Sequence, residues 1–254
     1  MRVQAIVTDL DRTLLRTDKS ISGYTLRVWE KCRKRGIKLF AASARPIRDV
    51  LEFGRKVHFD GVAATNGAVV AFEGEKLECG MGRAECEAVL EKLAELGDVF
   101  ISLETDVGLF SNRDIPQWKP TVYGCFPKLP EGVLPYKIIA SSDNPVLYAD
   151  PGRFLTEGVY HTVADGKLLQ VMSQNATKWK GVEQMLSRYG IPPENTVYFG
   201  DDNDDIEPIK NCGLGVAVAN AIPEVLSVAD RVAPSNDSDG VALFLEGLIG
   251  QATV

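Results

Sequence analysis

The chain has 254 residues, of which 45% are hydrophobic and 25% are charged, and its formal net charge is −7. This balance is typical of a globular protein, and the acidic charge argues against a nucleic-acid partner. No stretch approaches the roughly 20 apolar residues that cross a membrane, so no membrane partner is expected.

The cysteines and histidines limit the chemistry further. Five scattered cysteines, with no C-x-x-C pair, fit reduced thiols in a cytoplasmic protein, and the N-terminus lacks the pattern of a signal peptide. Two histidines, His58 and His161, are too few for a His-rich metal centre. The G-x-S-x-G motif of a serine hydrolase is also absent from the sequence.

The first predicted element is a buried parallel strand over residues 3–7, followed closely by Asp9, Asp11 and Thr13. Open α/β sheets bind ligands at the carboxyl ends of their strands, and two acids this close repel unless a cation or a shared proton holds them. The alternative is that Asp9 merely ends the strand while Asp11 caps a turn. The dipeptide pattern alone favours neither.

Helices and strands then alternate. Helices are predicted over residues 22–35 and 46–56, and strands over 37–42 and 61–65. A β-hairpin is predicted over 68–79. This βαβαβ order predicts a right-handed parallel sheet with helices on its faces.

The pattern changes near Met81. An amphipathic helix is predicted over 84–96, a Pro-rich stretch covers 116–135, and a short helix is predicted at 151–157. Short strands without long intervening helices indicate an inserted α+β module with an antiparallel sheet. These strands are predicted at 99–103, 107–111, 137–141, 146–149, 159–163 and 167–172.

The α/β alternation returns with a helix at 177–189 and a strand at 196–199 that runs into the acidic segment 200–205. The fold class is therefore predicted to be α/β. A parallel-sheet core of residues 1–80 and 171–254 would carry an inserted α+β domain of residues 81–170. The last predicted elements are helices at 206–211, 223–228 and 240–248 and a strand at 215–218.

Four polar clusters lie at predicted strand ends or at the helix starts that face them. Carboxylates such as Asp9 and Asp201 are suitable ligands for Mg²⁺. A helix N-terminus with a nearby hydroxyl group can bind phosphate, and a buried lysine would neutralise the charge of the phosphoryl group. Singly, Ser43 is better explained as a helix cap, Lys178 as a surface residue with Lys180 equally available, and the acidic run as a solvated loop. The clusters are Asp9/Asp11, Ser43/Arg45, Lys178 and residues 201–205.

In their order along nearly the whole chain, these motifs resemble those of the haloacid dehalogenase superfamily, specifically Cof-type phosphatases with a type IIB cap. Residues 9–15, DLDRTLL, resemble D-x-D-G-T-L, and residues 42–45, ASAR, resemble T-G-R. Residues 66–68 resemble N-G-A, Lys178 resembles the third motif, and residues 199–205 resemble G-D-x-x-N-D. The resemblance implies a Rossmann-like core with a cap domain that selects the substrate.

The resemblance also implies an activity, that of a cytoplasmic Mg²⁺-dependent phosphatase acting on a small phosphorylated metabolite, such as a sugar phosphate, through an aspartyl-phosphate. Asp9 would be the nucleophile and Asp11 the general acid and base. The implied metal ligands are Asp9, the Asp11 carbonyl oxygen, Asp201, and Asp205 as a further ligand or a support. The implied phosphate- and substrate-binding residues are Ser43, Arg45, Asn66, Gly67 and Lys178.

Four residues depart from the family pattern, and none of them removes a catalytic group. Arg12 replaces a glycine, so it is expected to tighten the turn after Asp11 or to add a cation. The other departures are Ser43 for Thr, Ala44 for Gly and Asp204 for Asn.

Two other functions share this chemistry. A phosphomutase or phosphotransferase uses the same aspartyl-phosphate, and sequence motifs do not separate it from a phosphatase. A phospho-accepting receiver module is about half this length and would not carry a built-in acid such as Asp11. Substrate choice is expected to lie in the inserted module. His161, Arg113 and Trp118 are candidate contacts there, although an isolated His or Trp in a small sheet is more often structural. A monomer or homodimer is expected.

Overall fold

The computed structural model describes residues 2–164 and 166–251, and the chain falls into two compact units. Unit 1 combines both ends of the chain, up to Leu77 and from Thr177 onward, while unit 2 is Glu78–Ala176. The chain therefore leaves unit 1 once and returns once. The boundaries between the two units fall at 77/78 and 176/177. The sequence analysis predicted these boundaries at 80/81 and 170/171.

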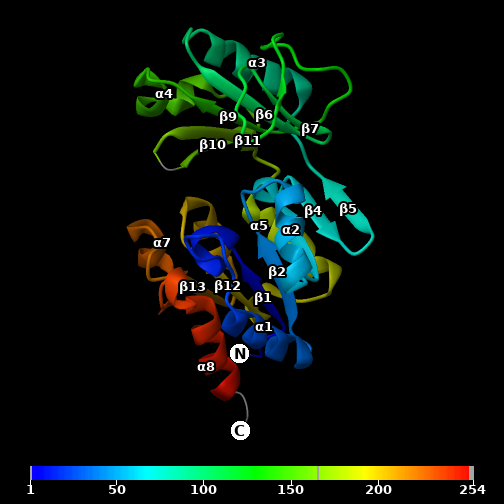
Figure 1. Cartoon of the computed structure of the whole chain (residues 1–254), viewed down its shortest axis with the longest axis vertical. Helices are drawn as coiled ribbons and strands as arrows, with labels where there is room; N and C mark the ends of the chain where they lie inside the picture. Colours follow the sequence, from blue (N-terminus) through cyan, green and yellow to red (C-terminus); the bar gives the residue numbers. More distant parts are fainter. Residues whose placement is uncertain (1, 165, 252–254) are drawn as a thin grey trace. The chain divides into compact units, whose positions relative to one another are not determined.

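Unit 1 is built on an eight-stranded sheet with the order β14-β13-β12-β1-β2-β3-β4-β5 (Figure 1). The six strands from β14 to β3 run parallel, and β4 is antiparallel to β3. This sheet confirms the predicted α/β class. The strands are β1 Ala5–Thr8, β2 Lys38–Ala42, β3 Gly61–Ala64, β4 Val69–Phe72, β5 Glu75–Glu78, β12 Thr196–Gly200, β13 Leu214–Val218 and β14 Arg231–Ala233.

The helices of unit 1 form two groups. In one, α1 packs against α2 and α8; in the other, α5 packs on β2, β3 and β4 and against α6. Side-chain caps begin α1 and α5, because the Ser22 hydroxyl accepts from the Thr25 N–H (3.0 Å) and the Thr177 hydroxyl from the Lys180 N–H (3.2 Å). The helices are α1 Gly23–Lys34, α2 Ile47–Val57, α5 Lys178–Arg188, α6 Ile206–Asn211, α7 Pro223–Val228 and α8 Gly240–Gln251.

Unit 2 has its own six-stranded sheet, in the order β10-β11-β9-β6-β7-β8, and its own hydrophobic core. Neighbouring strands are antiparallel except for β7 and β8. Helix α3, Arg83–Ala94, packs on β9 and buries Val89, Leu90 and Leu93 in the core. The strands are β6 Phe100–Thr105, β7 Gly108–Ser111, β8 Thr121–Val122, β9 Pro135–Ser141, β10 Val159–Ala164 and β11 Leu168–Ser173.

One predicted strand of unit 2 is wrong. Residues 146–149 form the short helix α4, Val146–Ala149, instead. Asn144 and Pro145 precede this helix, and the Asn144 side chain stabilises its first turn by accepting from the Val146 N–H at 3.1 Å. A four-residue apolar run fits a strand or a helix equally well, so its periodicity could not decide. Within the described ranges, no helix is both long enough and apolar enough to span a bilayer.

Candidate active site

Asp9 lies at the carboxyl end of the central strand of unit 1. Its N–H donates to the Phe199 carbonyl of β12 at 2.9 Å, and its own carbonyl accepts from the Thr8 hydroxyl at 2.7 Å. The chain then reverses in a short turn, Leu10–Leu14, with Arg12 in the left-handed region (φ 59°). The Asp9 side chain is buried. Its carboxylate is therefore fixed where an open α/β sheet binds its ligand.

Lys178, the first residue of α5, is the buried cation of the site. Its Nζ donates to Asp9 Oδ1 at 2.9 Å and to Asp205 Oδ1 at 2.7 Å. Burial opposes the charge on Lys178, but the carboxylates of Asp205 and Asp9 outweigh it and raise the pKa of Lys178 well above its usual value. Of the two lysines that the sequence offered, Lys178 thus makes the ion pairs with Asp9 and Asp205.

Close packing of α5 on a tight turn brings Lys178 to Asp9. The turn Thr65–Gly67 follows β3, and all three of its residues have positive φ. A Cβ on Gly67 would lie only 2.1 Å from the Thr177 carbonyl oxygen, and one on Gly181 only 2.7 Å from the Ala63 Cβ. Gly67, a predicted substrate-binding residue, therefore contacts the backbone that starts α5.

Asp205 is the anchor of the acidic loop. Its Oδ1 accepts from Lys178 and from the Tyr198 hydroxyl (2.7 Å), and its Oδ2 accepts from the N–H groups of Asp201 (2.9 Å) and Asp202 (3.1 Å). Asp205 is fully buried, and four donors satisfy its two oxygens. These bonds suit a supporting role, which is one of the two roles predicted for Asp205.

Asp201 completes the acidic cluster. Its Oδ1 accepts from the Thr13 hydroxyl at 2.7 Å, and its Oδ2 lies 3.8 Å from the Nε of Arg12. Burial, followed by the charge of Asp205, raises the pKa of Asp201 to about 6. Burial also raises the pKa of Asp9 well above its usual value, although Lys178 opposes this.

The cluster fits a hard divalent cation. One carboxylate oxygen each from Asp9, Asp201 and Asp205 lies within 4.8 Å of the others, and all three residues are buried. The donors are all oxygen, and Lys178 is the one buried cation paired with them among the described residues. Surplus negative charge on oxygen ligands is the environment that Mg²⁺ requires.

Asp11 belongs to a separate ion-pair group. Arg45 donates to both of its oxygens, through Nε to Oδ2 and through Nη2 to Oδ1 (2.8 Å), and Lys19 donates to Oδ1 at 2.6 Å. Burial alone would raise the pKa of Asp11, but these bonds and charges lower it overall. Lys19 was not predicted, because its position in a polar turn carried no motif. Asp11 is thus held ionised in this state.

Ser43 and Asn66, two further predicted residues, lie between the ion-pair group of Asp11 and the acidic cluster. The Ser43 hydroxyl accepts from the Arg45 N–H (3.2 Å), and the Ser43 carbonyl accepts from the Asn66 N–H (3.0 Å). The Asn66 side chain donates to Asp204, the last of the four departures from the resembled motifs. The buried Ser43 and Asn66 therefore connect the Arg45 side of the site with the acidic loop.

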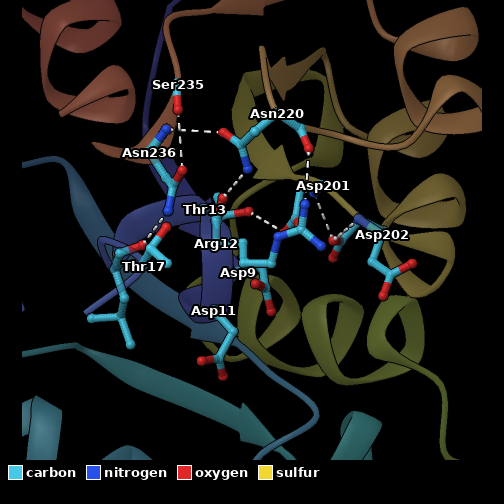
Figure 2. A network of polar contacts seen from close by, with 12 residues as sticks. Asp9, Asp11, Arg12, Thr13, Thr17, Asp201, Asp202, Asn220, Ser235 and Asn236 are labelled. Carbon is cyan, nitrogen blue, oxygen red and sulfur yellow. Dashed lines mark hydrogen bonds and ion pairs between the residues drawn. The ribbon is translucent and has the colours of Figure 1, made fainter. Parts of the chain in front are cut away.

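An asparagine network outside the predicted site holds the first loop in place (Figure 2). Asn220 Nδ2 donates to the Arg12 carbonyl at 2.8 Å, and the Asn220 side-chain oxygen accepts from the Asn236 N–H at 3.0 Å. Asn236 Nδ2 in turn donates to the Leu15 carbonyl at 3.0 Å. The loops after β13 and β14 thereby fix the segment that follows Asp9.

Known proteins that resemble this chain in sequence are hydrolases. A family model described as haloacid dehalogenase-like hydrolase matches residues 6–245. The 5-amino-6-(5-phospho-D-ribitylamino)uracil phosphatase YitU of Bacillus subtilis is 26% identical, over 95% of this chain and 96% of its own length. The phosphoglycolate phosphatase of Methanopyrus kandleri is 26% identical, over 96% of each chain.

A solved structure shows the same fold. The subclass IIB sugar phosphatase BT4131 superposes with a TM-score of 0.80 at 22% sequence identity, over 97% of this chain and 99% of its own. The predicted type of fold, a parallel-sheet core with an inserted α+β module, is therefore confirmed.

Proposed function

This chain belongs to the haloacid dehalogenase-like hydrolase family, and on that premise we propose that it is a Mg²⁺-dependent phosphatase of small phosphorylated metabolites that acts through a phosphorylated Asp9. The observation that carries the proposal is the buried ion pair between Lys178 and Asp9, beside the carboxylates of Asp201 and Asp205. A nucleophilic carboxylate, a phosphoryl-binding cation and an acidic metal site then meet at one edge of the sheet.

Asp9 and Asp201 would hold the metal together with the backbone carbonyl of Asp11, and Asp205 would support them. When bound, Mg²⁺ supplies the positive charge that keeps Asp9 ionised and polarises the phosphoryl oxygens. That charge is needed, because burial raises the pKa of Asp9 despite Lys178.

Asp9 would attack phosphorus through the oxygen that does not bond to Lys178. A bond forms between Asp9 and phosphorus while the bond from phosphorus to the ester oxygen breaks, and the leaving alcohol takes a proton from Asp11. In the second half-reaction Asp11 takes a proton from a water molecule, which attacks phosphorus and releases Asp9 and inorganic phosphate. Lys178 and the Ser43 hydroxyl would bind the phosphoryl oxygens.

Asp11 must change partners to act as the acid. In the present state, bonds from Arg45 and Lys19 lower its pKa and hold it ionised. We propose that an arriving substrate, itself an anion, draws these two cations away from Asp11. The freed carboxyl would then be able to take up the proton that it delivers.

We propose that unit 2 selects the substrate. Two relatives are named for small phosphoesters of different shape, a phosphorylated ribitylaminouracil and phosphoglycolate, which supports a small substrate but not one compound. The described cysteines Cys32, Cys79, Cys86, Cys125 and Cys212 are free, in keeping with a cytoplasmic enzyme. A monomer or a homodimer is proposed, to be tested by light scattering.

The test is phosphate release from p-nitrophenyl phosphate and a panel of small phosphoesters, with Mg²⁺ or with EDTA. The wild-type protein should release phosphate from these esters only when Mg²⁺ is present, and the Asp9→Asn variant should release none. Asp18→Asn, which changes an exposed acid of the same unit, should leave turnover unchanged. Phosphate appearing on an added sugar instead of in solution would favour the phosphomutase alternative, and no turnover of any ester would contradict both.

A further inference from the structure

Arg12 occupies a backbone conformation that suits glycine. Its φ of 59° and ψ of 6° are left-handed, which costs an L-residue about 1–2 kcal/mol. Two hydrogen bonds with Asn220 nevertheless hold this residue in place. Asn220 Nδ2 donates to the Arg12 carbonyl (2.8 Å), and Arg12 Nη2 donates to the Asn220 carbonyl (3.3 Å). Strain kept in place by specific bonds beside a reaction centre calls for a functional explanation.

The position of the guanidinium supplies one. Figure 2 shows it beside Asp201, and its Nη2 donates to the Asn220 carbonyl. Thr13 already bonds to Asp201 Oδ1, so Oδ2 is the oxygen left for a cation, and Arg12 Nε lies 3.8 Å from it. This distance is an ion pair but too long for a hydrogen bond, so the oxygen is not blocked.

We propose that Arg12 is a built-in counter-charge of Asp201 that lowers the affinity of the site for divalent cations. Between metal-binding events the guanidinium compensates part of the negative charge of Asp201. A metal ion bound to Asp201 then feels the repulsion of a fixed positive charge. The inference rests on the proposed function only in taking Asp201 as a metal ligand.

The expected size follows from Coulomb's law. The Arg12 side chain is 53% exposed, so its charge acts through a water-like dielectric. For a unit charge and a divalent ion roughly 6–12 Å apart, this corresponds to a change of about three- to tenfold in the dissociation constant. Because the charge is exposed, the effect should shrink at high ionic strength.

The experiment is isothermal titration calorimetry of Mg²⁺ into the metal-free full-length protein. Arg12→Asn removes the charge with a residue that tolerates the left-handed region, and it should bind Mg²⁺ about three- to tenfold more tightly than wild type. Arg12→Lys keeps the charge and should stay close to wild type. Lys119→Asn is the matched control, an exposed left-handed cation (φ 49°) in unit 2, and should change nothing.

Repeating the titrations at about 0.5 M KCl should narrow the gap between wild type and Arg12→Asn. Equal or weaker Mg²⁺ binding by Arg12→Asn would overturn the inference, as would equal tightening by Arg12→Lys, since charge would then not be the cause. The absence of Mg²⁺ binding in wild type would instead count against the metal site of the proposed function.

Discussion

Asp201 carries a charge that the metal-free fold does not fully compensate. Its pKa is raised from 3.8 to about 6 in the folded protein, so between about pH 4 and pH 6 the folded state holds more protons than the unfolded state. The free energy of unfolding of metal-free protein therefore falls as pH rises through this window. The ionised Asp201 destabilises the metal-free fold at neutral pH.

Asp201→Asn should consequently raise the free energy of unfolding at pH 7.5 in EDTA, by about 1–3 kcal/mol. The asparagine oxygen can still accept from Thr13, and the gain should fade as the pH approaches 4. Urea denaturation at several pH values measures this. Asp143→Asn, an exposed acid of unit 2, serves as the control, and a less stable Asp201→Asn at pH 7.5 would contradict the electrostatic explanation.

Lys19 should tune the pKa of Asp11, the proposed general acid. Lys19→Met removes a 2.6 Å bond to Asp11 Oδ1, so the pKa of Asp11 should move up from its lowered value. A general acid works at pH values below its pKa, and kcat/KM reports the free enzyme, in which Lys19 pairs with Asp11, so the pH above which kcat/KM declines should move upward. Measuring the pH profile of kcat/KM tests this, and Lys31→Met, which removes a surface pair with Glu246, should leave the profile in place. A profile unmoved by Lys19→Met would exclude Lys19 from this role.

At this scale the sequence predicted residues that belong to motifs and missed those that act only through the fold. Lys178 was identified by its place at a helix start, and the structure buries it against Asp9. Tyr198 was missed, because a tyrosine inside an apolar strand resembles any core residue. Its bond to Asp205 exists only because the loop folds back over the strand end.

The start of α5 is the element on which the site depends. Gly67→Ala would place a Cβ 2.1 Å from the Thr177 carbonyl, so α5 must shift and carry Lys178 with it. We expect the free energy of unfolding to fall by about 3 kcal/mol. We also expect the variant to lose most of its phosphatase activity. Gly74→Ala is the matched control, because Gly74 has a similar φ (79°) with open space around it, and should lose only about 1–2 kcal/mol. Equal losses in both variants would show that backbone conformation alone matters.

Among the elements, segments with local start and stop signals were predictable, including the short helices α6 and α7, and segments without such signals were not. The helix predicted at 177–189 is α5 at Lys178–Arg188, because its cap and its stop residue are both local signals. The strand β14, Arg231–Ala233, was not predicted. It is a three-residue edge strand with two exposed residues, so it lacks the apolar run that marks buried strands.

Across the whole molecule, the two ends of the chain interleave in one sheet. The strand β1 lies between β2 and β12, so the candidate metal ligands Asp9 and Asp201 come from opposite ends of the sequence. The order of motifs allowed this to be predicted. The limits of the inserted unit depend on packing between distant segments, which no local signal reports.

Binding of Mg²⁺ should therefore protect both ends of the chain at once. Hydrogen exchange should slow in β1 and β12 and in the loop 201–205, and remain unchanged in β9 and β11 of unit 2. EDTA should reverse the protection. Comparing exchange with Mg²⁺ and with EDTA, by mass spectrometry of peptides, is the measurement, and protection of unit 2 equal to that of β1 would contradict it.

The close contact between Gly67 and Thr177 has a consequence for recombination of such proteins. Thr177 is the first residue after the inserted unit, and the next residue is the lysine that pairs with Asp9. A chimera that takes its insertion from a relative must therefore be joined before Thr177, so that the recipient keeps its own helix start opposite its own Gly67. If the junction lies one or two residues later, the backbone at Thr177 and Lys178 comes from the donor protein. The defect would then be in unit 1, which the recipient supplies, and not in the donated unit 2.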